Sequence, residues 1–203
     1  MKPNVLCVTG GMGSGKSLAL QLLKEWGWPV YPADIRAKQL VAQTVELQLK
    51  LMDAFGSDAI DAHGQPNGAV LSTRAFENLN AWNTLNEIIH PSVHKDFAKW
   101  LTEEPQCNAA WVARESALHF EVGATEACTV ILLITASEET RKQRIAARQP
   151  GRKPEELYRR MAYQWSDEQK IGQLRTGDLH LTNDGTLADF TNKLTDKIRS
   201  LKV

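Results

Sequence analysis

A glycine-rich turn between an apolar run and a helical pattern constrains the fold of this chain most strongly. Residues 10–17 read Gly-Gly-Met-Gly-Ser-Gly-Lys-Ser, directly after the apolar run at residues 5–9. Leu18 and Leu22 then open an apolar pattern with helical spacing. A strand, a tight glycine turn and a helix in this order form a P-loop, whose backbone N–H groups and helix dipole surround phosphate groups. The turn therefore predicts a site for a nucleoside triphosphate.

The parts of this loop have separate expected roles. Lys16 has the length to reach the β- and γ-phosphates, and the Ser17 hydroxyl is a ligand for Mg²⁺. The remaining contacts to the phosphates are expected from the loop and the first turn of the helix, at Gly11, Met12, Gly13, Ser14, Gly15 and Leu18.

Length, charge and cysteine usage narrow the class of protein. A chain of 203 residues buries one substantial core, with room for inserted subdomains. Its formal net charge of zero gives no global attraction to nucleic acid or to anionic membranes, so neither is expected as a partner. The sequence shows no signal peptide and no run that could span a membrane.

Cys7 and Cys128 are expected in core strands as small apolar residues, with no disulfide or metal pattern, which favours a reducing cytoplasm.

Strand and helix patterns alternate along the chain. Apolar runs predict strands at residues 5–9, 28–31, 111–113, 129–134 and 179–181. Helical spacing lies between and after them, at residues 14–26, 35–55, 72–88, 91–102, 138–148, 155–174 and 187–201. This alternation predicts an α/β fold with a five-stranded parallel sheet.

Two helical stretches interrupt the alternation, at residues 36–106 and 141–175. The second holds ten Lys and Arg against four Asp and Glu, and a Pro/Gly stretch at residues 149–154 marks the tip of a lid. A P-loop core with a helical substrate-binding insertion and a basic helical lid is the layout of small-molecule kinases. We therefore expect an insertion at 36–106, a lid at 141–175 and a core formed by residues 1–35, 107–140 and 176–203.

Other P-loop classes fit the sequence less well. A GTPase carries Asn-Lys-x-Asp after a strand, whereas the nearest stretch here, residues 192–196, is one residue too long and lies in a predicted helix. Motor and transporter ATPases end an apolar strand with paired acids, which the run 129–134 lacks. These differences favour a phosphotransferase over a hydrolase.

A phosphotransferase needs an acid at the acceptor hydroxyl and cations at the transferred phosphoryl group. Asp34 follows the second predicted strand, at the edge of the sheet where ligands bind. Its alternative role is that of an N-cap for the helix at 35–55. Arg144 and Arg148 share one helix face, where they either bind phosphate or form a solvated surface.

The order of several motifs resembles that of the dephospho-CoA kinase family. The matching segments are Thr9 to Ser17, Val30-Tyr31-Pro32-Ala33-Asp34, His90-Pro91, Phe120-Glu121, Arg144-x-x-x-Arg148 and Asn183-Asp184-Gly185. The resemblance departs at Pro32, where the family pattern has an acid, and at residues 117–119, which read Ala-Leu-His in place of Pro-Leu-Leu.

The resemblance implies transfer of a phosphoryl group from ATP to the ribose 3′-hydroxyl of dephospho-CoA. It implies that Asp34 orients or deprotonates that hydroxyl, and that Lys16 and the loop amides hold the ATP phosphates with Mg²⁺ on Ser17. It further implies that Arg144 contacts the transferred phosphoryl group, Arg148 supports ATP and Asn183 lies near the adenine. We further expect Glu115 to take the role of a strand-end acid, acting through water bound to Mg²⁺.

Two alternatives to this reaction remain open. One is a P-loop kinase of another small acceptor, such as a nucleoside monophosphate. The other is a non-catalytic nucleotide-binding module. In each case the neutral chain is expected to be a monomer.

Overall fold

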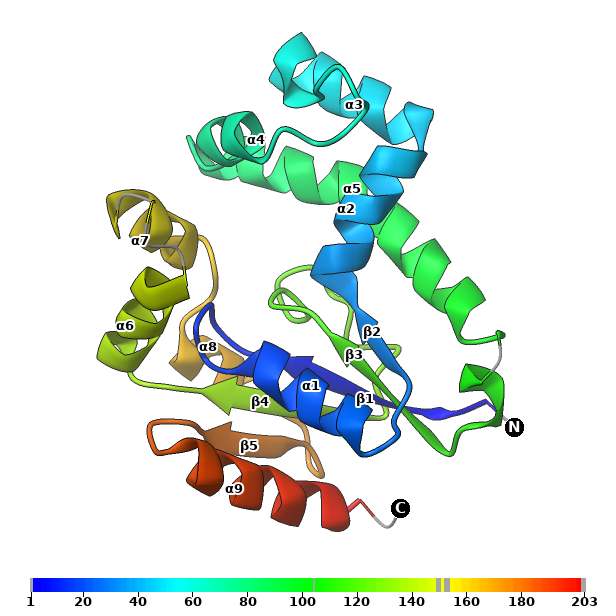
Figure 1. Ribbon diagram of the computed structural model, residues 1–203, viewed down its shortest axis with the longest axis vertical. Coiled ribbons are helices and arrows are strands. Elements are labelled where there is room, and N and C mark those ends of the chain that lie inside the picture. The colour runs from blue at the N-terminus through cyan, green and yellow to red at the C-terminus, as the bar shows by residue number, and fades with distance from the viewer. Residues whose placement is uncertain (1, 104, 149–150, 152–153, 202–203) are drawn as a thin grey trace. The chain divides into compact units, whose positions relative to one another are not determined.

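Five parallel strands form the single sheet of the computed structural model, which describes residues 2–103, 105–148, 151 and 154–201. The strands are β1 (Asn4–Thr9), β2 (Val30–Pro32), β3 (Trp111–Glu115), β4 (Val130–Thr135) and β5 (Leu179–Thr182). They lie in the order β2-β3-β1-β4-β5, and every pairing is parallel (Figure 1). The predicted α/β class and parallel sheet are confirmed.

Helices cover the central strands, which explains their continuous apolar runs. On one face, α1 (Lys16–Glu25) and α9 (Leu187–Arg199) pack on β1, β3 and β4 through a shared core that includes Leu23, Phe190 and Leu194. The short helix α8 (Asp167–Ile171) packs beside β4 on the other face (Figure 1). The buried strands therefore carry the loops at their carboxyl ends on a rigid support.

The chain divides into two compact units. The sheet unit consists of Met1–Pro32 and Leu101–Val203, and the helical unit is Ala33–Trp100. Within the helical unit, α2 (Ala33–Gln43), α3 (Val45–Phe55), α4 (Gly68–Ala75) and α5 (Leu79–Trp100) surround an apolar core of their own. Its fully buried members include Leu51 and Ala75.

The helical unit differs from the sequence expectation in where its helices break. The predicted helix 35–55 is two helices, because Thr44 adopts an extended conformation between α2 and α3. The predicted helices 72–88 and 91–102 were placed wrongly. Residue Asn78 accepts a hydrogen bond from the backbone N–H of Ala81 and so caps the start of α5, which then runs through Pro91 without ending.

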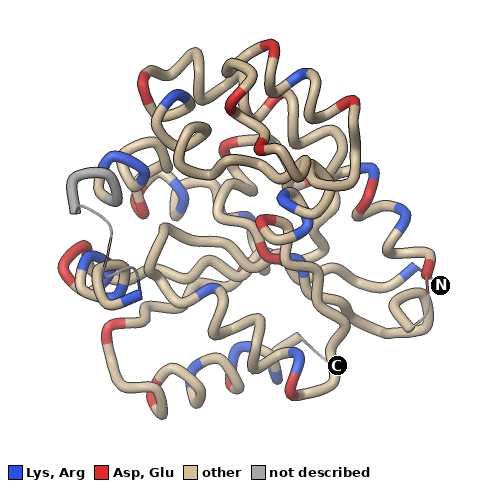
Figure 2. Tube along the Cα trace, turned by 45° about the horizontal axis from the view of Figure 1, so that its top comes forward, with Lys and Arg blue, Asp and Glu red and all other residues tan. Residues whose placement is uncertain are grey.

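The basic region also breaks earlier than predicted. It consists of α6 (Glu138–Arg148), α7 (Pro154–Ala162) and α8, so the single helix expected at 155–174 is wrong. Ser166 and Gln169 form a capping box at the N-terminus of α8, which makes α8 a separate helix. Lys and Arg recur along α6 and α7 (Figure 2). Of the expected lid tip, residues 149, 150, 152 and 153 lie outside the described residues.

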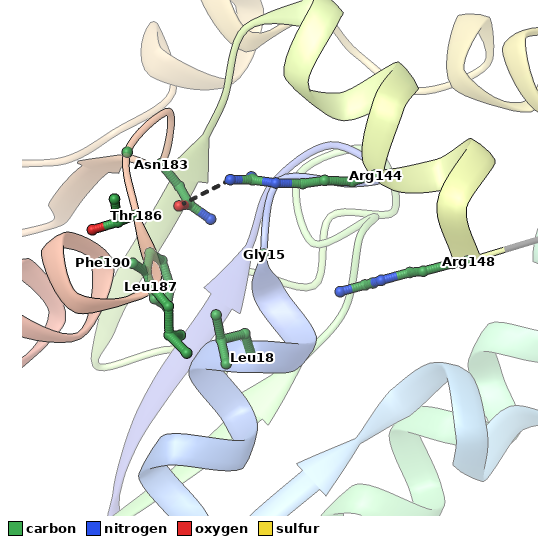
Figure 3. Close-up of a pocket in the computed structure, with 9 residues that line it drawn as sticks. Gly15, Leu18, Arg144, Arg148, Asn183, Thr186, Leu187 and Phe190 are labelled. Carbon is green, nitrogen blue, oxygen red and sulfur yellow. Dashed lines mark hydrogen bonds between the residues drawn. The ribbon is translucent and has the colours of Figure 1, made fainter.

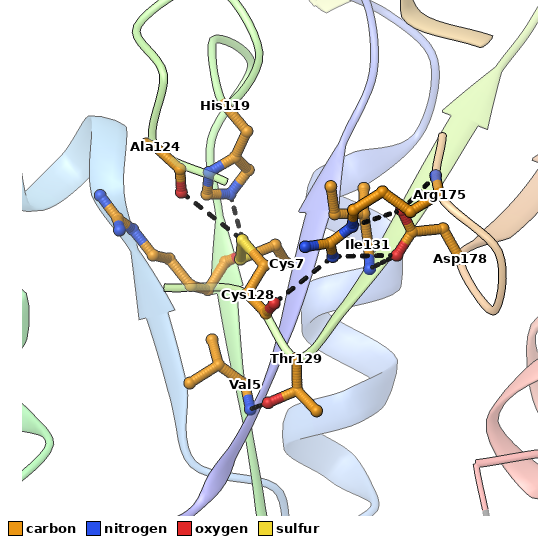
Figure 4. The surroundings of a disulfide bond; sticks show 10 residues. Val5, Cys7, His119, Ala124, Cys128, Thr129, Ile131, Arg175 and Asp178 are labelled. Atoms are coloured by element: carbon orange, nitrogen blue, oxygen red, sulfur yellow. Dashed lines mark hydrogen bonds and ion pairs between the residues drawn. A yellow bond between two sulfur atoms is a disulfide. The ribbon is translucent and has the colours of Figure 1, made fainter. Parts of the chain in front are cut away.

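A disulfide joins Cys7, in the middle of β1, to Cys128, two residues before β4 (Figure 4). The expectation of separate thiols is therefore wrong, and Cys128 precedes its strand rather than lying in it. His119 is also buried here, and one of its ring nitrogens lies within 4.8 Å of both sulfurs. The spacing along the chain did not predict this cluster, because Cys7 lies more than a hundred positions before the other two members.

None of the helices in the described residues is both long enough and apolar enough to cross a lipid bilayer.

Candidate active site

The P-loop connects β1 to α1 and takes a shape that only glycine allows at two positions. Gly10 has φ +145°, and a Cβ there would overlap the carbonyl oxygen of Ile134 in β4. Gly15 has φ +112°, and a Cβ there would overlap the Asn183 side chain. The loop is therefore held close to β4 and to the end of β5.

The N-terminus of α1 offers its N–H groups to an anion. Gly15 is the N-cap residue and has no side chain that could occupy these groups. The buried Lys16 ammonium donates to the Gly11 carbonyl oxygen at 3.1 Å, so it lies against the loop. Ser17, the next residue, is exposed. Both side chains occupy the positions that a P-loop assigns to phosphate and to Mg²⁺.

Arg144 and Asn183 meet beside this loop (Figure 3). Asn183 donates from Nδ2 to the Ser14 carbonyl oxygen at 2.7 Å, while its backbone N–H donates to Thr135 at 2.8 Å. Arg144 donates from Nη2 to Asn183 Oδ1 at 3.4 Å and from Nη1 to the Gly13 carbonyl oxygen at 3.5 Å. The structure thus places these two predicted residues, from α6 and from the end of β5, against the P-loop.

An open cavity of about 140 Å³ lies next to these contacts. Arg144 and Arg148 line one side of it, and Gly15, Leu18 and Asn183 line another. Gly185, Thr186, Leu187 and Phe190 complete the lining from the turn after β5 and the start of α9 (Figure 3). The cavity combines two cations with apolar surface directly beside the phosphate loop, an arrangement suited to a nucleotide.

Two acids lie at the carboxyl ends of neighbouring strands: Glu115 ends β3, and Asp34 follows β2. Glu115 is the last residue of β3, is buried, and lies in register with Val8 of β1. Asp34 is the second residue of α2, exposed, two positions after β2 ends. Because α2 begins at Ala33, Asp34 lies within its first turn and is not its N-cap. The structure therefore leaves the carboxylate of Asp34 exposed at the start of the helical unit.

A buried ion pair supports the site and was not foreseen from the sequence. The Lys170 ammonium, fully buried, lies 3.0 Å from Glu121 Oε1 and donates to the Ala117 carbonyl oxygen at 3.2 Å. Burial lowers the pKa of Lys170, the Glu121 carboxylate opposes this lowering, and the Lys16 ammonium adds to it. The repulsion between the two ammonium groups couples this pair electrostatically to the P-loop lysine.

Two further residues that contact the loop were not predicted from the sequence. Gln164, in the turn between α7 and α8, accepts a hydrogen bond from the Met12 backbone N–H at 2.8 Å. Arg141 of α6 lies directly over Gly11 and Gly13. The signal for Arg141 was present, because positions 141, 144 and 148 share one helix face.

Comparisons with known proteins agree with this geometry. The family model described as dephospho-CoA kinase matches residues 4–189. The dephospho-CoA kinase of Chlorobium chlorochromatii is 31% identical over 190 residues, covering 91% of this chain and 87% of the relative. That of Porphyromonas gingivalis is 35% identical over 157 residues, covering 77% of this chain and 75% of the relative. The crystal structure of TT1252 from Thermus thermophilus superposes with a TM-score of 0.78 at 28% identity, covering 99% of each chain. With a family model that matches nearly its whole length, the chain belongs to the dephospho-CoA kinase family.

Proposed function

We propose that this protein transfers the γ-phosphoryl group of ATP to the ribose 3′-hydroxyl of dephospho-CoA, giving ADP and coenzyme A. The observation that carries the proposal is the P-loop itself. Its helix N-terminus is open, and Arg144 and Asn183 lie beside it, in a chain that the family model matches from residue 4 to residue 189.

The sheet unit holds ATP in this proposal. The amides from Gly11 to Leu18 and the Lys16 ammonium bind the phosphates, and the adenosine lies in the cavity between α6 and the start of α9. Arg148 lines this cavity and supports ATP, while Asn183 lies near the adenine. Arg144 contacts the phosphoryl group in transfer, where charge spreads over its equatorial oxygens.

Mg²⁺ fits the oxygen donors at this site. Ser17 presents an exposed hydroxyl at the start of α1, and the Glu115 carboxylate ends the strand that pairs with β1. Hydroxyl and carboxylate oxygens, with water, are the ligands that Mg²⁺ prefers. When bound, the ion neutralises charge on the β- and γ-phosphates.

The acceptor is assigned to the helical unit, with residues 36–106 as the insertion that binds it and residues 141–175 as the lid. Asp34 orients the 3′-hydroxyl and takes its proton as the new P–O bond forms. Because the transition state of phosphoryl transfer is loose, orientation of the hydroxyl matters more than the basicity of Asp34. A closed lid keeps water from competing with the hydroxyl.

We assign the protein to the cytoplasm as a monomer, without nucleic acid or membrane as partner. The balanced charge supports the absence of polyanionic partners, since it provides no field that would attract them. The disulfide between Cys7 and Cys128 removes the argument for a reducing compartment that separate thiols would have given. Light scattering coupled to size-exclusion chromatography tests the monomer directly.

The test of the function is ADP release from Mg-ATP with and without dephospho-CoA, with the product identified by mass and by the position of its phosphate. We expect ADP release that depends on the acceptor and a phosphate on the 3′-oxygen. Adenosine 5′-monophosphate and gluconate serve as control acceptors. ADP release that ignores dephospho-CoA, or that follows a control acceptor, would overturn the proposal in favour of an ATPase or of another kinase.

A further inference from the structure

Arg141 contacts the P-loop through both its backbone and its guanidinium. A Cβ on Gly13 would lie 2.8 Å from the Arg141 carbonyl oxygen and 3.0 Å from its Cα. A Cβ on Gly11 would overlap the guanidinium at Nη1. Backbone and guanidinium are therefore both packed against the loop, in space that its glycines leave open.

The position of the guanidinium relative to Lys16 indicates which phosphate it faces. The Lys16 ammonium, which in a P-loop reaches the β- and γ-phosphates, donates to the carbonyl oxygen of Gly11. The Arg141 guanidinium lies on the same glycine. The two cations therefore lie at the same residue of the loop, Gly11, where the lysine of a P-loop would meet the terminal phosphates of a bound nucleotide.

The contacts of Arg141 leave part of its hydrogen-bonding capacity unused. Its side chain is only 16% exposed, and Nη1 lies 3.6 Å from Asp167 Oδ1, beyond ordinary hydrogen-bond length. Within the described part of the chain, the buried Arg141 Nε and Asp167 Oδ1 have no hydrogen-bond partner. A guanidinium has five donors in a planar fork that matches phosphate oxygens, and buried donors normally find acceptors.

From these contacts we infer that Arg141 is a further phosphate-binding residue, which binds the γ-phosphate of ATP, and that Asp167 is its partner while the site holds no nucleotide. The inference rests on the proposed function, since it takes ATP as the ligand of the loop. A γ-phosphate over Gly11 supplies the acceptors that the guanidinium lacks. The carboxylate of Asp167, an anion from the first turn of α8, holds the guanidinium near the loop until then.

A γ-phosphate ligand predicts a difference between two nucleotides. The probes are ADP and the β,γ-imido analogue of ATP, each titrated with Mg²⁺ by calorimetry against the full-length wild type and Arg141→Gln. The variant should bind the analogue at least about tenfold more weakly and ADP within about twofold of wild type, because a charge-assisted hydrogen bond is lost only with the longer nucleotide. Lys142→Gln is the matched control, since it removes the same charge from the next residue, whose partner is Glu138. It should bind both nucleotides as wild type does.

Equal losses for the two nucleotides, or no loss for either, would overturn the inference and leave Arg141 a packing residue of the loop. If Arg141→Gln does not fold, Arg141→Lys decides, because it keeps the charge without the fork and should weaken only the analogue. Asp167→Asn should bind the analogue at least as tightly as wild type, and a tenfold loss there would contradict the assigned role of Asp167. If the wild type binds neither nucleotide, the proposed function is refuted. If it binds nucleotide but transfers no phosphoryl group to dephospho-CoA, the proposed function is refuted while the role of Arg141 stands.

Discussion

Asn183 Nδ2 donates to the carbonyl oxygen of Ser14 at 2.7 Å, although 169 residues separate the two in the chain. The bond is buried and fixes the P-loop to the end of β5. The loop is therefore anchored by a segment that lies far beyond it in the sequence.

Replacing Asn183 by Ala should reduce both stability and nucleotide binding. The Ser14 carbonyl loses a buried partner, which costs about 1–3 kcal/mol of unfolding free energy, and the loop loses its anchor. Urea unfolding and ADP titration measure the two effects. Asn192→Ala, at an exposed position of α9, is the control and should change neither. Wild-type stability in Asn183→Ala would show that the bond does not hold the loop.

Gly10 and Gly27 both have positive φ, but they differ in the space around the Cβ position, so their substitutions compare the cost of close packing with that of backbone strain. Gly10→Ala and Gly27→Ala both place a side chain at positive φ, which costs about 1–2 kcal/mol. Gly27 has open space around its Cβ position, whereas Gly10 faces the Ile134 carbonyl oxygen. Gly10→Ala should therefore be the more destabilising of the two in thermal unfolding, and it alone should weaken nucleotide binding. Equal losses of stability would mean that the close approach to β4 carries no cost.

The buried pair Lys170–Glu121 should behave as a unit. Lys170→Met leaves the Glu121 carboxylate buried without its cation, which costs about 3–5 kcal/mol of unfolding free energy. The double variant with Glu121→Gln keeps an acceptor for the Trp165 backbone N–H and should recover much of that loss. A double-mutant cycle by urea unfolding measures the coupling. Additive losses would contradict a specific interaction between the two side chains.

Asp178 makes stability depend on pH. Burial acts to raise the pKa of this carboxyl, but hydrogen bonds from the Arg175 side chain and from the backbone N–H groups of Ile131 and Arg175 outweigh it, so the pKa lies below its usual value. A lowered acid pKa gives stability that is present above the unfolded-state value of about 3.9 and is lost as the pH falls through the folded-state value.

The wild type should therefore be more stable than Asp178→Asn at pH 7, by about 1.5–3 kcal/mol for the charged hydrogen bonds, and this advantage should shrink below about pH 4. Urea midpoints of both proteins at pH 7, 5 and 3 give the difference directly. A difference that stays constant down to pH 3 would assign the effect to packing and not to charge.

Asp34→Asn tests the acceptor side of the proposed reaction. The amide lacks the charged acceptor that orients the hydroxyl and cannot take its proton, so kcat should fall by about 10²- to 10⁴-fold with little change in ATP affinity. Asp53→Asn removes an exposed acid from α3 of the same unit and should leave turnover unchanged. Phosphoryl transfer at the wild-type rate in Asp34→Asn would favour a different residue as the one that orients the hydroxyl.

Local patterns predicted the parts of this protein that local physics determines. The buried strands and the P-loop were predicted because continuous apolar runs and glycine turns act over a few residues. The breaks at Asn78 and Ser166 were missed although both residues are good N-caps, because the surrounding apolar spacing continued through them. Pro91 was taken as a helix start, and its place inside α5 follows from packing that the sequence does not display.

The contacts between distant segments could not be predicted in the same way. Arg144 and Asn183 were expected at the nucleotide through a family resemblance, whereas their meeting at Ser14 and Gly13 is visible only in the fold. Gln164 reaches Met12 across 152 positions and has no local signature. Spacing along the chain likewise says nothing of Cys7 and Cys128, which pack together only once β1 and β4 are adjacent.

The bond between Cys7 and Cys128 closes a covalent ring across a separation of 121 residues, and the whole helical unit lies inside that ring in sequence. A protease that cuts once within residues 33–100 would therefore open the ring without releasing a fragment. The strand that carries the P-loop would stay bonded to the segment leading into β4, and the nicked protein would run as one molecule until a thiol separated its two pieces.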